Sequence, residues 1–300
     1  MNDVYVMLTM DCEAAKIDVS AHGREISGSG PAEYADSETS IRGYVESARA
    51  LGYPVTLFVH PEVAVAHAAL LQELKGGGTC LGLHLHPYKF AGDRYDRDLG
   101  AYSAEDQRSI LAEAVDVWGE ALGFRPIYFR AGYFSANDST VSALLALGFE
   151  GGSLSNPGRI LPDHASVWAG APAYPHRAHE AFRLIEGDTD FIEVPVAVAY
   201  GRPVEQGHAG ERGFEWPYIP HTYDHSRVIE DILNRFVEEA PGFGTIVTDT
   251  HNDQDYADPN HASSQNLKSI IATIEAVCAA RNLVVHGVTL DRMCHLVRAA

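Results

Sequence analysis

The sequence predicts an α/β fold in which parallel strands alternate with helices in a single domain, residues 1–300. Short apolar runs alternate with longer segments of helical periodicity along most of the chain, and the runs are apolar at successive positions, as in strands covered on both faces. Polar side chains follow the ends of several runs. In a closed barrel all these ends meet on one face, whereas in an open sheet only those near a switch point meet, so a barrel is favoured.

The first half of the chain repeats the strand-helix unit. Gly52, Gly148 and the run of three glycines from Gly76 follow helical segments directly, as expected at helix C-termini. A polar loop rich in Gly and Ser is expected up to about residue 36. The predicted strands are 4–10, 54–60, 80–84 and 127–130, and the predicted helices are 37–51, 61–75, 104–122 and 139–147.

The alternation lapses at about 151–221, where loops rich in Pro, Gly and His surround one strand-like run at 191–199. We interpret this segment as a loop-rich insertion over the mouth of the barrel. The alternation then resumes to give about seven βα units in all. The predicted elements are helix 224–240, strand 244–248, helix 262–280, strand 283–286 and a last helix from Thr289.

Composition excludes several classes of protein. With 46% hydrophobic and 21% charged residues, the chain can bury a sizeable core. A net charge of -19 without a cluster of Lys or Arg argues against a nucleic-acid partner. No apolar stretch is long enough to cross a bilayer and no leader pattern is recognised, so a cytoplasmic protein is expected. The four cysteines lack CxxC spacing and fit reduced, buried thiols: Cys12, Cys80, Cys278 and Cys294.

The first candidate motif is an acidic pair at the end of the first strand. Asp11 and Glu13 are two residues apart, so on an extended chain both side chains point the same way. One carboxylate could bind a metal while the other accepts a proton. The motif alone leaves open a pair of solvated acids at a strand end.

The second motif is a pair of histidines at the end of the third strand. His84 and His86 are also in phase on extended chain and can chelate one divalent ion, zinc first, although iron, cobalt and nickel accept the same ligands. Hydrogen-bonded core histidines are the alternative. Two His and one carboxylate leave positions open for water and substrate, which is what a hydrolytic metal requires.

Two further strand ends carry candidate groups. Arg130 follows a buried strand and needs an anion, for which a carboxylate of the first motif is the natural partner, although a purely structural ion pair is equally consistent. Gly132 would let the backbone near Tyr133 approach a substrate and offer an amide to an oxyanion. His251 follows the strand 244–248, with Asp249 just before it, and could protonate a leaving amine.

Taken in order, these motifs resemble those of the NodB-homology polysaccharide deacetylases, carbohydrate esterase family 4. The matching segments are 9–13 (TMDCE), 83–88 (LHLHPY), 130–133 (RAGY) and the late His251. The resemblance spans essentially the whole chain. It implies a distorted (β/α)7 barrel and a metal-dependent hydrolase that removes an acyl group, first of all acetyl, from the amide of an N-acetylated sugar or glycoconjugate.

The resemblance also implies roles for the catalytic residues. Asp11 would be the general base and Arg130 its tethering partner. Tyr133 would supply the backbone amide of an oxyanion hole, and His251 would be the general acid.

For the metal, the resemblance implies Glu13 as the carboxylate ligand of variant members and His84 as the first histidine ligand. The common second motif has its histidines four apart, but Tyr88 stands there, so His86 would bind from a different backbone position, as in an H-x-H-P variant subgroup. Cys12 stands where the commonest members carry a metal-binding Asp. A thiolate ligand in place of Glu13 therefore remains an alternative.

The candidate substrate-binding side chains are aromatic: Trp168, Trp216 and Tyr88. Either tryptophan is a candidate for the fourth family motif, and simple packing of the loops is equally consistent. The expected partner is a small molecule or glycan, and the oligomeric state stays open, a homo-oligomer included. Two other functions remain open. One is a metal-independent hydrolase of C–N bonds in small cyclic ureides or imides, as in some relatives, and the other is a non-catalytic carbohydrate-binding barrel.

Overall fold

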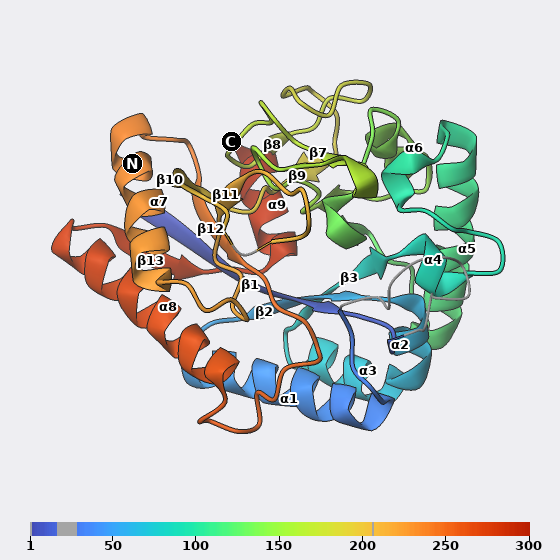
Figure 1. Ribbon diagram of the computed structural model, residues 1–300, viewed down its shortest axis with the longest axis horizontal. Helices are drawn as coiled ribbons and strands as arrows, with labels where there is room; N and C mark the ends of the chain where they lie inside the picture. Colours follow the sequence, from blue (N-terminus) through green and yellow to red (C-terminus); the bar gives the residue numbers. More distant parts are fainter. Residues whose placement is uncertain (1, 17–28, 206) are drawn as a thin grey trace.

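The core of the protein is one curled sheet of mainly parallel strands, seen in a computed structural model that describes residues 2–16, 29–205 and 207–300 (Figure 1). Its central strands pair in parallel in the order β12-β1-β2-β3-β4 and are apolar on both faces, as the sequence predicts. Their bounds are β1 Asp3–Cys12, β2 Val55–Val59, β3 Cys80–Leu85, β4 Tyr128–Ala131 and β12 Gly244–Thr248.

The sheet continues through short strands at one edge and does not form a complete ring. Beyond β4 it runs to β5 (Gly151–Gly152), β9 (Ile192–Glu193) and the antiparallel β8 (His176–Arg177), while β13 (Val284–Gly287) pairs with the start of β1. Within the described ranges, no strand pairing joins β8 to β12. The predicted barrel is therefore present in distorted form.

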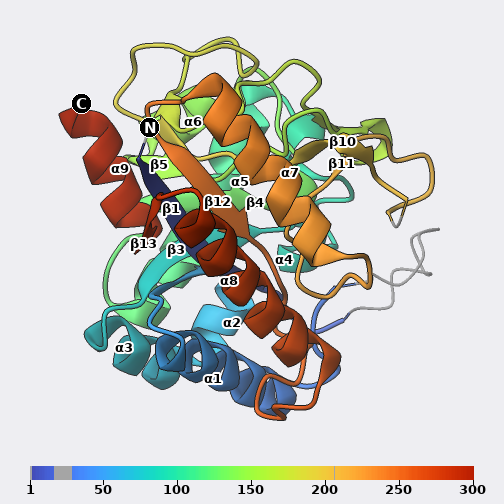
Figure 2. The same cartoon turned by 90° about the vertical axis from the view of Figure 1, so that its left-hand side faces the viewer.

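Helices cover the outer surface of the sheet (Figures 1 and 2). In Figure 2 the helices α7 and α8 lie side by side over β12 and β13, and α1 and α3 lie below the sheet. The helices are α1 Tyr34–Ala50, α2 Pro61–Ala66, α3 Ala68–Gly76, α4 Pro87–Phe90, α5 Ala104–Leu122, α6 Thr140–Ala146, α7 His225–Glu239, α8 Ala262–Ala280 and α9 Leu290–Ala299.

Helix ends follow local capping rules. The side chain of Asp224 accepts hydrogen bonds from the backbone N–H groups of Ser226 and Arg227, so it caps α7. Helix α5 begins after Ser103, whose side chain accepts from the Asp106 N–H, and it ends at Gly123 with φ of 78°. The predicted bounds 104–122, 262–280 and 244–248 coincide with α5, α8 and β12.

Three local predictions are corrected. The single helix expected at 61–75 is wrong, because His67 has φ of -121° and ψ of 28° and divides it into α2 and α3. The strand expected at 191–199 is also wrong as one element: Pro195 lacks an N–H for the ladder, and within this range only β9 and the first residue of β10 belong to strands. The loop expected up to residue 36 ends earlier, at α1, and residues 17–28 of it lie outside the described part.

The segment 151–221 contains two small antiparallel pairs besides β5, β8 and β9. They join β6 (Ile160–Leu161) to β7 (Ser166–Val167) and β10 (Ala199–Pro203) to β11 (Phe214–Glu215). None of the helices in the described ranges has the length and apolarity needed to cross a membrane. All four cysteines are buried and free.

Candidate active site

The predicted residues meet in a pocket at the C-terminal ends of the parallel strands. Its volume is about 470 Å³, and the strand ends supply Asp11, Glu13, His84, His86, Asp249 and His251 to its lining. The segment after β12 is held against β1, because the Asp11 N–H donates to the Thr250 carbonyl at 2.8 Å. This backbone contact brings residues about 240 positions apart into one site.

Arg130 lies at the base of the site and is fully buried. Its Nη1 donates to Asp11 Oδ1 at 2.9 Å and to Asp249 Oδ1 at 2.9 Å. The same nitrogen lies 2.8 Å from Thr9 Oγ1, and Nη2 lies 3.0 Å from Ser153 Oγ. A buried guanidinium needs such acceptors, and Asp11 is the carboxylate partner that the sequence predicted.

Asp249 is a second carboxylate on the same guanidinium, and the sequence reasoning gave it no role. Burial and the nearby charge of Asp11 raise the pKa of Asp249 to about 7, although Arg130 and His251 act against this. Asp11, Asp249 and His251 could form a metal-binding group by distance. Because Arg130 Nη1 already contacts both carboxylates, the cation at this group is the arginine.

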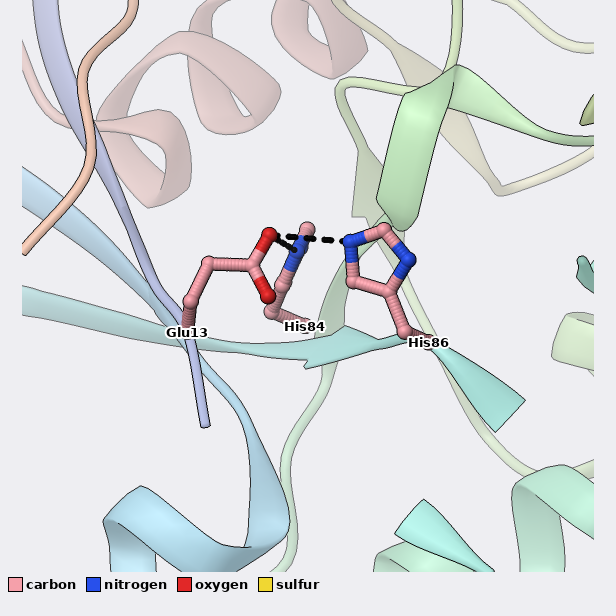
Figure 3. Close-up of side chains that lie close together, drawn as sticks. All are labelled: Glu13, His84 and His86. Atoms are coloured by element: carbon pink, nitrogen blue, oxygen red, sulfur yellow. Dashed lines mark hydrogen bonds and ion pairs between the residues drawn. The ribbon is translucent and has the colours of Figure 1, made fainter. Parts of the chain in front are cut away.

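A second set of donor atoms converges in the same pocket (Figure 3). Glu13 Oε1 lies 3.2 Å from His84 Nε2 and 2.8 Å from His86 Nε2. All three side chains are at most 2% exposed. In Figure 3 the carboxylate of Glu13, at the end of β1, points toward both rings, which come from β3 and its end.

The hydrogen bonds of the outer ring nitrogens show which atoms face the centre. His84 Nδ1 lies 3.0 Å from the Arg130 carbonyl oxygen, which can only accept, so Nδ1 carries a hydrogen. His86 Nδ1 faces Asp98 Oδ1 at 3.7 Å, which favours a hydrogen on this Nδ1 too. Both Nε2 atoms thus face Glu13 Oε1, and imidazoles that keep their hydrogen on Nδ1 would turn two lone pairs, with the carboxylate oxygen, toward a cation held between them.

Glu13 is also held by groups that the sequence reasoning missed. Lys89 Nζ, in α4, donates to Glu13 Oε2 at 2.7 Å, and Ser29 Oγ donates to Oε1 at 3.0 Å. Burial by itself raises the pKa of Glu13, but His86, Lys89 and His84 outweigh it and hold the pKa well below its usual range. The Glu13 N–H donates to Asn252 Oδ1 at 2.8 Å, which fixes the backbone.

Cys12 is not placed as a ligand. Successive side chains on a strand alternate, so Cys12 points away from the face shared by Asp11 and Glu13. It is fully buried and is absent from the residues that line the pocket. Burial, with the nearby charges of Asp11 and Glu13, raises its pKa well above the usual range, so the sulfur stays a thiol.

His251 lies on the pocket wall opposite the histidine pair. Its Nε2 is 3.8 Å from Glu13 Oε1, and its Nδ1 is hydrogen-bonded to Tyr218 Oη at 2.8 Å. The Tyr218 ring stacks on Trp216 with centroids 5.2 Å apart. This fixed imidazole edge, 15% exposed, can exchange a proton with a molecule in the pocket.

The turn after β4 brings a second wall of the pocket into place. Tyr133 has φ of 55° and ψ of 13°, a left-handed conformation that is uncommon for a residue with a side chain. Arg159 Nη1 donates to its carbonyl at 3.1 Å, which supports the turn. Gly132 also leaves room for the His86 ring, because a Cβ there would lie 2.1 Å from His86 Cε1.

The three aromatic candidates have different positions. Trp216 lines the pocket. Trp168 is 2% exposed, lies outside the pocket lining and donates its indole N–H to the Phe134 carbonyl at 2.7 Å. Tyr88 is buried with its ring edge-on to His86, 5.3 Å between centroids, and is also absent from the lining. The structure therefore brings only Trp216 to the cavity.

Comparisons with known proteins identify the fold. No protein-family model matches the sequence, and no curated protein matches it. Among solved structures, a Mycobacterium smegmatis protein assigned as a polysaccharide deacetylase is 16% identical, with 99% of this chain and 91% of that chain covered and a TM-score of 0.60. A Parabacteroides distasonis protein assigned as a glycoside hydrolase/deacetylase is 13% identical, with 99% and 72% covered and a TM-score of 0.67.

A third solved structure, Puue allantoinase, is 12% identical, with 99% of this chain and 91% of that chain covered and a TM-score of 0.59. The chain thus shares its fold with the polysaccharide deacetylases that the sequence motifs resemble. Identities this low establish the fold, and the function has to be argued from the site.

Proposed function

We propose that this protein is a metal-dependent hydrolase that removes an acyl group, first of all acetyl, from the amide of an N-acetylated sugar or glycoconjugate. The observation that carries the proposal is the convergence of Glu13 Oε1, His84 Nε2 and His86 Nε2 beside an Asp11 held by Arg130. A carboxylate and two neutral imidazoles are the ligands of many hydrolytic metals. The fold shared with polysaccharide deacetylases supports the same reading.

The metal is proposed to be one divalent ion, zinc first, with iron, cobalt and nickel as alternatives that accept the same donors. Glu13, His84 and His86 would hold it. When bound, such an ion polarises a carbonyl oxygen and makes a water more acidic. The donor set fits because both Nε2 atoms face the Glu13 carboxylate while the Nδ1 atoms face acceptors on the other side of each ring.

The chain's own residues would move the protons. Asp11 keeps one oxygen on Arg130 Nη1, and its other oxygen lies 3.8 Å from His84 Nδ1, so this carboxylate is placed to take a proton from the attacking water. Water then adds to the carbonyl carbon, the C–N bond breaks, and acetate and a free amine result. His251, oriented by Tyr218, would give a proton to the leaving nitrogen. The backbone at Tyr133 is the proposed oxyanion donor.

Metal analysis of the purified chain, combined with hydrolysis of a panel of N-acetylated sugars, tests the proposal. We expect one metal per chain, lost in His84→Ala and in His86→Ala. Asp11→Asn should keep the metal and lose about 10²- to 10⁴-fold in turnover. Full metal occupancy in both histidine variants would refute the ligand set, and hydrolysis abolished by Asp11→Asn would rule out a non-catalytic carbohydrate-binding barrel.

A specific contact favours the second candidate, a metal-independent hydrolase of C–N bonds in small cyclic ureides or imides. Lys89 Nζ gives Glu13 a positive partner at 2.7 Å from within the chain. The fold is also shared with an allantoinase, and a pocket of about 470 Å³ is of a size that suits a small molecule. Activity toward such heterocycles that survives removal of all metal would establish this candidate.

We propose that the chain forms a single catalytic domain in which 151–221 is an insertion that supplies pocket residues such as Arg159 and Trp216. The proposed partner is a small molecule or glycan rather than nucleic acid, in keeping with the net charge of -19. Four buried, free cysteines are consistent with a reducing compartment such as the cytoplasm.

A further inference from the structure

Asp98 is a buried carboxylate that lies behind His86, on the side away from Glu13. It directly precedes the short 3-10 helix η2 (Leu99–Ala101) and is 4% exposed. Its Oδ1 lies 3.7 Å from His86 Nδ1, and both atoms are buried with no hydrogen-bond partner in the part of the chain that the structure describes. Buried polar atoms without a partner are costly, so two that face each other indicate an interaction that a small movement would complete.

The other end of the His86 ring shows which movement is needed. His86 Nε2 lies 2.8 Å from Glu13 Oε1, which is hydrogen-bond distance. Two ligand atoms of a tetrahedral zinc ion, each about 2.0–2.1 Å from the metal, lie roughly 3.4 Å apart. To admit an ion, the two atoms must therefore separate by about half an ångström. A shift of the ring away from Glu13 carries Nδ1 toward Asp98.

The far side of Asp98 is anchored. Its Oδ2 lies 2.9 Å from His164 Nδ1, and the His164 ring lies against Tyr133 with centroids 3.9 Å apart. Asp98 is thus held in place by a residue that is not a candidate ligand, while its free oxygen faces one that is. A carboxylate that accepts the Nδ1 hydrogen of a metal-binding histidine orients the ring and makes it a better ligand.

We propose that Asp98 is a positioning residue for the metal: it accepts the His86 Nδ1 hydrogen when an ion enters between Glu13, His84 and His86, and so tightens metal binding. This inference rests on the proposed metal-dependent function. It assigns to Asp98 an effect on metal affinity that a carboxylate kept only for packing would not have. Removing an outer partner of this type typically lowers metal affinity about 10- to 100-fold.

The test is a competition titration of Zn²⁺ and Co²⁺ against a chromogenic chelator, with the metal-free full-length chain. Asp98→Asn should bind zinc about 10-fold more weakly than the wild type, and Asp98→Ala about 100-fold, each still reaching one metal per chain. The visible spectrum of the Co²⁺ form should change. His164→Phe keeps an aromatic ring beside Tyr133 and leaves Asp98 Oδ1 free. It should therefore lose less zinc affinity than the Asp98 variants do.

Glu193→Gln is the matched control. Glu193 is also buried, and it accepts the backbone N–H groups of Leu154 and Ser155, away from the proposed ligands. Its substitution should lower the melting temperature without changing zinc affinity. The same pattern in Asp98→Asn, a lower melting temperature with unchanged affinity, would overturn the proposal.

A measurement on the wild type covers the case in which the Asp98 variants do not fold. In the zinc-loaded protein, NMR should show a slowly exchanging Nδ1–H of His86, and a rapidly exchanging or missing one would overturn the proposal. A wild type that binds no metal instead refutes the proposed function itself. A wild type that binds zinc tightly, with Asp98 variants that bind equally tightly, refutes only the role of Asp98.

Discussion

Asp249 and Asp11 share one nitrogen of the Arg130 side chain: Nη1 lies 2.9 Å from an oxygen of each. Two buried carboxylates on one cation cannot both be ionised at low cost, which is why burial and the charge of Asp11 raise the pKa of Asp249 to about 7. Asp249 therefore gains or loses a proton near neutral pH, on the same guanidinium that holds Asp11.

Asp249→Asn should change how stability depends on pH. In the unfolded chain the pKa of Asp249 is near 4, and in the folded chain it is higher, so its contribution to stability is complete below pH 4 and is lost as pH rises to 7. Asparagine does not titrate. The free energy of unfolding of the variant, relative to that of the wild type, should therefore rise across this range by up to about 1.4 kcal/mol per pH unit. Urea unfolding of the metal-free proteins at pH 5 and pH 8 measures this.

The control is Asp116→Asn, at an exposed position. Its unfolding free energy should differ from that of the wild type by an amount that hardly depends on pH. If the unfolding free energies of Asp249→Asn and wild type differ by the same amount at both pH values, the raised pKa of Asp249 in the folded chain is contradicted.

Gly132→Ala should disable the histidine pair without touching a ligand. The new Cβ would lie 2.1 Å from His86 Cε1, so the ring has to leave its place. We expect zinc affinity to fall by at least about 10-fold, because even the loss of an outer partner of a ligand typically costs that much. Gly76→Ala, where a Cβ meets nothing within 4 Å, should bind zinc as the wild type does. Wild-type affinity in Gly132→Ala would show that His86 is not held as a ligand.

Lys89→Met should destabilise the metal-free protein and make it more dependent on metal. Removing the ammonium leaves the buried Glu13 without its closest cation, and breaking such a pair typically costs about 3–5 kcal/mol. A bound zinc ion would replace that charge. Zinc should therefore raise the melting temperature more in the variant than in the wild type.

Thermal unfolding with and without zinc measures this, and Lys268→Met, an exposed lysine, should behave as the wild type. An equal rise in both proteins would mean that zinc does not bind at Glu13.

Variants of the two tryptophan candidates should have different effects, one on kcat/KM and the other on stability. Trp216 lines the pocket, so Trp216→Ala should lower kcat/KM by roughly 2- to 10-fold through loss of aromatic contact with substrate. Trp168 is buried outside the pocket and hydrogen-bonds the Phe134 carbonyl, so Trp168→Phe should cost about 1–3 kcal/mol of stability and leave KM unchanged. A raised KM in Trp168→Phe alone would reverse this assignment.

The parts of the site that could be predicted lie at the ends of apolar strands. Asp11, His84 and Arg130 each follow a run that is buried on both faces, and parallel strands bring such ends together. Two-residue spacing places Glu13 on the same face as Asp11, and His86 on the same face as His84. Local periodicity is sufficient to predict these positions because the pairing of parallel strands brings their C-terminal ends together.

The groups that escaped prediction act through tertiary contacts. Asp98 lies in a loop between α4 and α5, and its position behind His86 follows no local pattern. Lys89 directly follows the histidine motif, but its contact with Glu13 depends on the turn at α4. The same limit explains the break at His67 between α2 and α3, because helical periodicity alone does not reveal it.

The origin of the pocket walls has a consequence for engineering. The proposed reacting groups come from the strands β1, β3 and β4 and the end of β12, whereas Arg159, Trp216 and Tyr218 come from the segment 151–221 beside the incomplete ring. The same segment also holds reacting groups in place, because Tyr218 contacts His251, Arg159 contacts the Tyr133 carbonyl and Ser153 contacts Arg130. Grafting it from a protein of the same fold is therefore a route to new substrates only if these three residues are retained.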